Sequence, residues 1–470
     1  MSRLIKSRRV PVGWLALCAC LAPPCVGSEA DQFFVIQAVD AENGWPVPLV
    51  QLTTTHHEVL VTDNAGVAVV DQPELFDREV WFAIEGHGYR VPADGFGYRG
   101  VRLTPRRGES ATIELQRQLP AKRVGRLTGA GLFAESQKVG RYADWTEQGV
   151  FGCDSIQHAV HTGRLYWLWG DTTLAGYPLG RFHSTGATTP VTPLKELRPP
   201  LRLRFGYFLG QDKLPRNIAQ MPGEGPTWLS GMVSLPDAAG EDRLVATYSK
   251  IRPPLADYER GLCVWDKAAN QFKLHKVLWA ASEDQPRPTP APMGHPVLWR
   301  HADGRQWAYY GDPFPALRHP ATFEDWQNPD AWEVLEPQET VAARSGAQEV
   351  TPHRGAIAWN AFRHKWVTVF TQQGGESSYL GELWYAEADA PTGPWRDAVK
   401  VVTHNKYTFY NPALHPEMTP NGSPMLLFEA TFTHTFSGAH TPVARHDYNQ
   451  VLYRIDLDEP PFSEIAEDAR

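Results

Sequence analysis

The chain has 470 residues, with 45 Lys and Arg against 53 Asp and Glu, and a formal net charge of −8. The acidic charge is spread without long runs, which argues against nucleic acid or an anionic membrane as a partner. Of five cysteines only Cys153 and Cys263 lie beyond residue 30, so the sequence holds no disulfide framework, and without CxxC or HExxH it predicts no structural zinc site.

The first residues are predicted to be an export signal. Basic side chains precede an apolar run at residues 10–23 that is too short to span a bilayer. Residues 1–28 are therefore expected to be removed, leaving a secreted, periplasmic or outer-surface protein without a membrane span. A rival interpretation is a lipoprotein, because Leu17-Cys18-Ala19-Cys20 resembles a lipobox, with a lipid anchor at Cys20.

Residues 29–118 are predicted to form a small all-β domain. Strands are expected at 33–39 and 47–54, and a strand pair around a turn at 59–68, which is the spacing of a β-sandwich. This pattern, with its VTDNAG stretch, resembles the carboxypeptidase regulatory-like, transthyretin-like sandwich family. These residues show no catalytic set, so the domain is expected to be a spacer, a stability partner or a weak glycan contact. Residues 119–123 are expected to be a linker.

The stretch 150–173, VFGCDSIQHAVHTGRLYWLWGDTT, predicts two strands joined by a turn at Thr162-Gly163. A two-residue turn there places Asp154 opposite Asp171. Like charges at this spacing, roughly 4.5–5.5 Å between Cβ atoms, destabilise a sheet, so the pair is expected to have a use. The uses are a shared proton, a bound cation, or the acid and base of a glycosidase. The alternative is a register shifted by one, with one Asp ending a strand in solvent.

The pattern repeats along the chain. WAYYGD at 307–312 echoes YWLWGD at 166–171. A two-residue turn at Asp303-Gly304 would place His295 opposite Asp312, just as Asp154 faces Asp171.

The next unit would place Arg354 opposite Thr371, and strands at 243–250 and 424–430 complete the set. Five units of this size, each opening with two apolar strands, predict an all-β fold, a five-bladed β-propeller at residues 124–458. A strand at 450–457 would close it, and residues 459–470 form a tail. The residues that end the five second strands are Asp171, Lys250, Asp312, Thr371 and Ala430.

Propeller geometry brings the start of each first strand and the end of each second strand to one mouth of the channel. Carboxylates there would serve proton transfer and attack at a sugar carbon, and cations and His would hold hydroxyls or a uronate. The residues expected to converge are Asp154, Asp171, His295, Asp312, Arg354 and Lys250.

Each of these residues also has a structural alternative. Asp312 precedes a proline and would suit a turn, Arg354 and Lys250 would suit ion pairs with the Asps, and His295 would suit a buried core position.

The motif GCDS...GRLYWLWGDTT, with its two Asps, is similar to the opening blade of a bacterial propeller family that includes endo-D-arabinanases. YAEADAPTGPW at 385–395 resembles the blade-ending turn shared with five-bladed furanosidases, invertases and glycoside phosphorylases. The resemblance implies that Asp154 and Asp171 are a catalytic pair. Segments 428–434 and 445–450 match no characterised catalytic motif.

The sequence therefore predicts an exported enzyme acting on a polysaccharide or oligosaccharide, a glycoside hydrolase. Asp154 is expected to be the base or nucleophile, and Asp171 or Asp312 the proton donor. The residues expected to contact substrate are His295, Arg354, Lys250, Trp169, His158 and Tyr410.

Two other classes stay open from the sequence. One is a carbohydrate-binding propeller without catalysis. The other is a polysaccharide lyase, in which His295 or Tyr410 abstracts a proton and Arg354 neutralises a uronate. No cofactor is required, although Asp154 and Asp171 with His158 on the same strand face would offer oxygen and nitrogen ligands to calcium.

Overall fold

The computed structural model describes residues 32–146, 149–192, 194, 199–435, 437–438, 442–443 and 447–468. These residues are almost entirely strands and loops, so the all-β prediction is confirmed. The predicted signal peptide and Cys20 lie outside the described residues. No helix in the described part is both long and apolar enough to cross a membrane. The α-helices there are α1 (Ala134–Lys138), α2 (Phe323–Trp326) and α3 (Phe462–Asp468).

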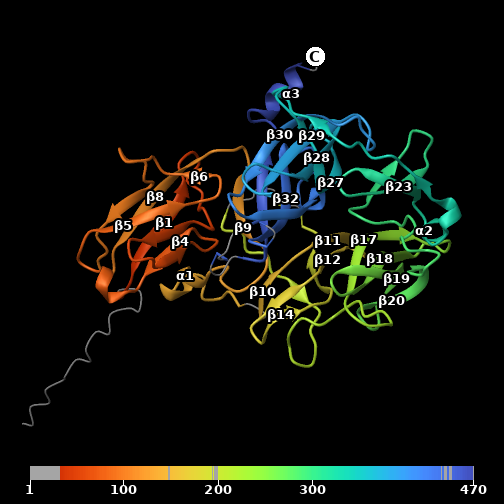
Figure 1. Ribbon diagram of the computed structural model, residues 1–470, viewed down its shortest axis with the longest axis horizontal. Coiled ribbons are helices and arrows are strands. Elements are labelled where there is room, and N and C mark those ends of the chain that lie inside the picture. The colour runs from red at the N-terminus through yellow and green to blue at the C-terminus, as the bar shows by residue number, and fades with distance from the viewer. Residues whose placement is uncertain are drawn as a thin grey trace, which may run out of the picture.

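The N-terminal region consists of two four-stranded sheets that share one hydrophobic core (Figure 1, red and orange). One sheet has the order β4-β1-β8-β6 and the other β3-β2-β5-β7. Phe34 and Ile36 of the first sheet pack with Leu52 and Phe82 of the second. The strands are β1 (Phe34–Asp40), β2 (Gln51–Thr54), β3 (Val59–Val61), β4 (Val67–Val70), β5 (Val80–Glu85), β6 (Tyr89–Arg90), β7 (Gly100–Leu103) and β8 (Ser110–Arg117).

The predicted strand pair at 59–68 is wrong, because β3 and β4 belong to different sheets. The Asp63 carboxylate accepts hydrogen bonds from the backbone N–H groups of Ala65 and Val67. This tight turn passes the chain from one sheet to the other instead of folding it back on itself.

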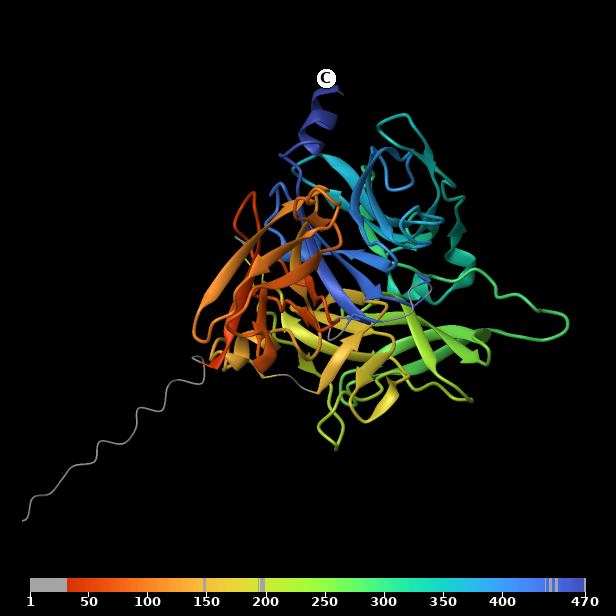
Figure 2. The ribbon, with the colours of Figure 1, turned by 60° about the vertical axis from the view of Figure 1, so that its left-hand side comes forward.

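Five four-stranded antiparallel sheets follow in the described residues, with strand orders β11-β12-β15-β16, β17-β18-β19-β20, β21-β22-β23-β24, β27-β28-β29-β30 and β31-β32-β33-β9. Figure 2 shows the yellow, green, teal and blue sheets following one another around the body, with the N-terminal sheets to one side.

The strands of this second region fall close to the expected ranges wherever a second strand was predicted, at β12, β18, β22, β28 and β32. Additional strands form a three-stranded sheet, β10-β13-β14, and a short pair, β25-β26. The bounds are β9 (Lys122–Arg126), β10 (Val150–Cys153), β11 (Gln157–His161), β12 (Arg164–Trp169), β13 (Thr172–Leu174), β14 (Tyr177–Arg181), β15 (Thr185–Pro190), β16 (Gly206–Tyr207), β17 (Thr227–Pro236), β18 (Asp242–Arg252), β19 (Ala256–Asp266), β20 (Gln271–Ala280), β21 (Val297–Arg300), β22 (Gln306–Gly311), β23 (Pro315–Pro320), β24 (Glu333–Val334), β25 (Val341–Ala342), β26 (Glu349–Val350), β27 (Pro352–Asn360), β28 (Lys365–Gln372), β29 (Glu382–Ala388), β30 (Arg396–Thr403), β31 (Thr408–Leu414), β32 (Met425–Thr433) and β33 (Asn449–Asp456).

The β11–β12 hairpin has the register that a Thr162-Gly163 turn predicts. Gln157 pairs with Leu168 and His161 with Arg164. Thr162 and Gly163 both have positive φ, 47° and 74°, as a type I′ turn requires. The same register, continued beyond the ends of the two strands, places Asp154 opposite Asp171.

The β21–β22 hairpin differs by one residue from the prediction. Val297 pairs with Tyr309, and the turn contains the three residues 302–304. His295 consequently faces Gly311, whose carbonyl accepts the His295 N–H at 2.8 Å. An Asp-Gly pair suits two- and three-residue turns alike, so the sequence could not distinguish them.

The β27–β28 hairpin keeps the predicted register between 355–360 and 365–370. An irregularity between Pro352 and Gly355 interrupts the pairing where Arg354 lies. The regular pairing ends at Gly355 and Phe370, so the predicted pair of Arg354 with Thr371 lies just beyond it.

The last sheet is closed by β9, which pairs with β33. The predicted linker at 119–123 is thus partly an edge strand, and the predicted closing strand at 450–457 is the third strand of its sheet. Lys122 Nζ donates to Asp456 at 2.7 Å, and Arg123 Nε donates to the Tyr453 hydroxyl at 2.9 Å. The register of this closing pair is fixed by buried side chains as well as by the ladder.

The N-terminal sheets are joined to this strand through the VTDNAG turn. The Asn64 amide donates to the Arg126 carbonyl and accepts the Arg126 N–H, both at 2.9 Å. Asn64 is fully buried, and both of its hydrogen bonds are to β9, so this turn holds the N-terminal sheets against the second region.

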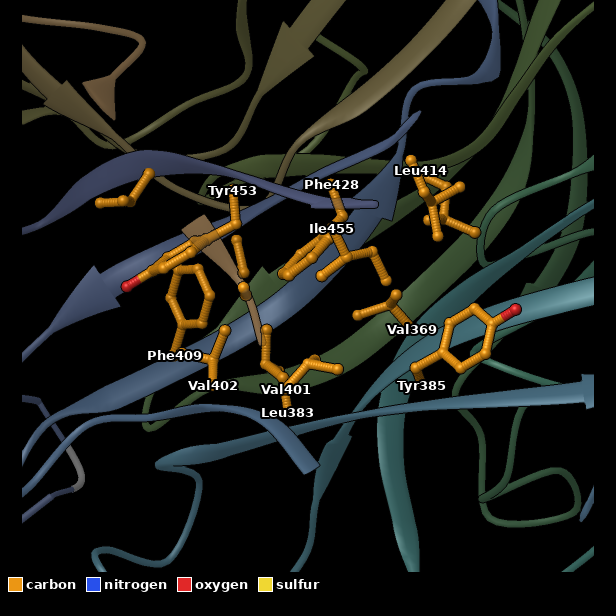
Figure 3. Packing of buried hydrophobic residues seen from close by; sticks show 14 of the residues in the cluster. Val369, Leu383, Tyr385, Val401, Val402, Phe409, Leu414, Phe428, Tyr453 and Ile455 are labelled. Carbon is orange, nitrogen blue, oxygen red and sulfur yellow. The ribbon is translucent and has the colours of Figure 1, made fainter. Parts of the chain in front are cut away.

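The largest core lies between the last two sheets (Figure 3). Val369, Leu383 and Val401 face Phe409 and Phe428 across it. Two residues of the predicted tail, Phe462 and Ile465, belong to the same core. Residues beyond 458 therefore contribute to the packing of the region before them.

Candidate active site

Asp154 and Asp171 meet where β10 and β12 end. The Asp154 N–H donates to the Asp171 carbonyl at 3.1 Å, and the Gly170 N–H donates to the Asp154 carbonyl at 2.9 Å. The Asp154 Oδ1 atom accepts the Asp171 N–H at 2.7 Å. The two acids lie opposite each other, and the first carboxylate is bound to the backbone of the second.

Gly170 leaves the space that the Asp154 carboxylate fills. A Cβ atom at position 170 would lie 2.5 Å from Asp154 Oδ1. Gly170→Ala is therefore expected to displace this carboxylate, to cost about 1–3 kcal/mol of stability and to reduce turnover by ~10²-fold. Urea unfolding and steady-state kinetics measure the two effects. Gly176→Ala is the matched control, because a Cβ there meets nothing within 4 Å; equal losses in both variants would contradict the argument.

Two tyrosines from the end of the chain complete the pair's surroundings. The Tyr410 hydroxyl donates to Asp154 Oδ2 at 2.8 Å, and the Tyr448 hydroxyl lies 3.5 Å from Asp171 Oδ2. Gly152 permits the approach of Tyr448, because a Cβ at 152 would lie 2.0 Å from the Tyr448 carbonyl oxygen. The first and last sheets thus meet at the two acids.

The surroundings of the two carboxyls differ. Burial raises the pKa of Asp154, while the hydroxyls of Tyr448 and Tyr410 and the Asp171 N–H oppose that rise by stabilising its charge. Burial, and then the charge of Asp154, raises the pKa of Asp171 to about 8. Among the described residues no group forms a hydrogen bond with the buried Asp171 Oδ1. The proton that the pair keeps at neutral pH therefore belongs on Asp171 and the negative charge on Asp154.

Asp171 and Tyr448 line a cavity of about 750 Å³. Phe151 and His434 also line it, together with Asp447, whose carboxylate binds His434 Nδ1. Sequence reasoning noted the segments that hold these two residues but assigned them no role. Their only sequence signal was a cluster of polar and aromatic residues around β32 and β33. They bring an imidazole to the wall of the cavity that Asp171 faces.

Asp312 and Arg354 line a different cavity, of about 690 Å³. Arg354 lies 3.6 Å from Asp312, whose Oδ1 also accepts the Gly355 N–H at 2.8 Å. Burial raises the pKa of Asp312 to about 6, although the charge of Arg354 opposes the rise. Asp312 is thus a second carboxyl of altered acidity, and it is paired with the cation that the sequence placed near it.

Lys250 does not offer its charge to a substrate, and that expectation is corrected. Its side chain is buried, and its Nζ donates to the carbonyls of Gly223 and Gly225 at 3.0 and 2.8 Å. These bonds hold the loop that precedes β17, so Lys250 has a structural role.

Trp169 is also a core residue rather than a wall of the site. It is 1% exposed and stacks on Trp167 at 6.2 Å between ring centroids. Alternation along β12 turns both rings into the core, whereas Asp171 beyond the strand end faces the cavity.

His158 lies away from the acid pair, among His415, Glu417 and His295. Its Nδ1 lies 3.4 Å from Glu417 Oε1. Burial lowers the pKa of His295 to about 3 and that of His158 to about 4. Burial also opposes the charge of His415, but Glu417 and Glu429 raise its pKa to about 9.

The predicted calcium site at Asp154, Asp171 and His158 is not formed in the described residues. Both oxygens of Asp154 instead accept hydrogen bonds, from the Asp171 N–H and from the Tyr410 hydroxyl. His158 instead directs Nε2 to the Leu414 carbonyl at 2.9 Å. The Asp pair is thus arranged for proton transfer, with one protonated and one ionised carboxyl side by side.

Several solved structures are similar to this chain. An exo-1,5-alpha-L-arabinanase from a bovine ruminal metagenomic library has 11% sequence identity and a TM-score of 0.38, over 66% of this chain and 95% of that chain. A family 43 glycoside hydrolase from Bacillus licheniformis has 12% identity and a TM-score of 0.36, over 65% and 71%. A β-xylosidase/α-arabinofuranosidase from a compost microbial metagenome has 13% identity and a TM-score of 0.36, over 65% and 92%. No family model matches the chain, and no curated protein matches its sequence.

Proposed function

We propose that this protein is an exported glycan-active enzyme, a glycoside hydrolase that uses Asp154 and Asp171. The observation that carries the proposal is the opposed carboxyl pair: Asp154 accepts the Asp171 N–H and the Tyr410 hydroxyl, while burial and the charge of Asp154 raise the pKa of Asp171 to about 8. Cleavage of a glycosidic bond needs one carboxylic acid and one carboxylate at the same bond.

In this mechanism Asp171, which lines the 750 Å³ cavity, donates its proton to the leaving oxygen. Asp154 is the base that activates water, or the nucleophile that attacks the anomeric carbon. Tyr410 holds Asp154 ionised by donating to Oδ2. As Asp171 loses its proton, the charge on it repels that of Asp154, which favours a proton's return from water to the pair.

The lyase alternative has less support. Burial and the neighbouring Asp154 raise the pKa of Tyr410 well above its usual range, so Tyr410 is a hydrogen-bond donor and a poor base. The raised pKa of Asp171 and the hydrogen-bonded charge of Asp154 also exceed what a binding module needs.

The domain organisation belongs to the same proposal. The two N-terminal sheets with one core support a carboxypeptidase regulatory-like sandwich at 29–118, and the five successive four-stranded sheets support a five-bladed β-propeller at 124–458. Residues 1–28 would direct export, with Cys20 as the lipid-anchored residue if the lipoprotein alternative holds.

A screen of the exported chain against a panel of polysaccharides tests the function. New reducing ends without the ultraviolet absorbance of a new double bond are expected, and Asp154→Asn should release them ~10³-fold more slowly. A product with that double bond would identify a lyase. Retention of the protein on one polysaccharide with no product from any would identify a binding protein.

A further inference from the structure

Three side chains outside the acid pair gather at one point between the first and last of the five sheets. His158 lies on β11, and His415 and Glu417 follow β31. One ligand atom from each lies within 4.8 Å of the others. His158 and Glu417 also line a cavity of about 390 Å³ that contains none of the residues around Asp171.

The hydrogen atoms of this cluster can be assigned from its partners. The Leu414 carbonyl can only accept, so His158 Nε2, at 2.9 Å, carries hydrogen. A neutral His158 then has a lone pair on Nδ1, which lies 3.4 Å from Glu417 Oε1, another acceptor.

His415 contacts the same Glu417 oxygen from another side. Its Nε2 lies 2.7 Å from Glu429 Oε1, and its Nδ1 lies 3.1 Å from the same Glu417 oxygen. With Nε2–H donating to Glu429, the Nδ1 atoms of both rings point at one carboxylate. His415, whose pKa is about 9, keeps a proton toward Glu417, and a bound cation that replaced this proton would join all three groups.

The outer partners are those of a metal site. A histidine that binds a metal commonly donates its other N–H to a carboxylate or a backbone carbonyl, which fixes the ring. Here Glu429 does this for His415 and Leu414 for His158. The Nδ1–Oε1 separations of 3.4 and 3.1 Å also match the roughly 3.3 Å between two ligands of a tetrahedral zinc ion with bonds of about 2.05 Å.

We propose that His158 Nδ1, His415 Nδ1 and Glu417 bind one divalent transition-metal ion of the zinc class. Two imidazoles and one carboxylate suit such an ion, whereas calcium takes six to eight oxygen ligands. A water molecule from the adjoining cavity would complete the coordination. The ion would tie the first sheet to the last, and a proton shared by His415 and Glu417 is the occupant it displaces.

This inference does not rest on the proposed function, and its test needs no substrate. The purified chain is stripped with a chelator and titrated calorimetrically with zinc chloride and, separately, with calcium chloride. One zinc ion per chain is expected, with a rise of several degrees in melting temperature and no saturable calcium binding. Cobalt(II) should give the intense visible absorption of four-coordinate geometry.

The variants locate the ion. Glu417→Gln and His158→Gln should each weaken zinc binding at least 100-fold, whereas His161→Gln, on the same strand but bonded to Ser234, should change it less than threefold. If one variant fails to fold, the other and the wild-type stoichiometry still decide. Absent stoichiometric zinc, zinc binding undiminished in both variants, or a preference for calcium would each overturn the proposal.

Discussion

Asp154→Asn is expected to lower turnover by ~10³-fold while leaving the melting temperature unchanged or slightly raised. The asparagine Oδ1 still accepts the Asp171 N–H, and the Tyr410 hydroxyl can turn to accept from the new amide. The substitution removes a buried charge beside Asp171, so the folded state is relieved of an unfavourable electrostatic free energy and keeps its hydrogen bonds. Turnover on the polysaccharide found by the screen and calorimetric melting measure the two effects.

The opposite pattern would assign Asp154 to the fold. If Asp154→Asn melts several degrees lower, and activity falls only with the folded fraction, its carboxylate is a cap for the Asp171 N–H. Catalysis would then be sought at Asp312 with His295. Asp312→Asn is the matched control, because that carboxyl is also buried and also accepts a backbone N–H, and it lines the other cavity.

Chemical rescue separates the two acids. Azide is expected to restore turnover to Asp154→Ala, because a small anion can replace a missing base or nucleophile. It should not restore Asp171→Ala unless the leaving group departs without a proton. If azide restored only Asp171→Ala, Asp171 would be the base or nucleophile and Asp154 the proton donor.

The local part of the site could be predicted from the sequence. Thr162-Gly163 fixes the register of one hairpin, because both residues adopt positive φ, and from that register the opposition of Asp154 and Asp171 follows. The same reasoning failed at His295, where a three-residue turn shifts the pairing by one. The register of a hairpin depends on the length of its turn, and an Asp-Gly pair is compatible with turns of two or three residues.

The long-range part could not be predicted. Tyr448 and His434 reach the site from segments that lie more than 250 residues after Asp171, and no pattern near them marks that proximity. The closing strand comes from the other end of the chain, because β9 follows the N-terminal sheets. Lys250 and Trp169 were placed on the right strands but turned inward, since a strand's end does not show which face of it is buried.

The raised pKa of Asp171 predicts a stability that falls as the pH rises. An unfolded Asp releases its proton near pH 4, whereas the folded Asp171 keeps it to about pH 8. Between these values the folded state binds one proton more than the unfolded state, so each pH unit costs up to about 1.4 kcal/mol of unfolding free energy from this group. The stability that this proton provides is fully present below the unfolded pKa, decreases as the pH rises from there, and is gone above about pH 8.

Asp171→Asn should remove this slope. In urea unfolding at pH 5, 6, 7 and 8, the free energy of unfolding of the variant, relative to that of the wild type, is expected to increase at each step up to pH 8. Asp312→Asn should show a gain that stops near pH 6, where the pKa of that carboxyl lies. Because kcat/KM of the wild type depends on the same proton, it should fall above about pH 8. Parallel stability curves for wild type and Asp171→Asn would mean that Asp171 is ionised across this range, and the proton donor would have to be another group.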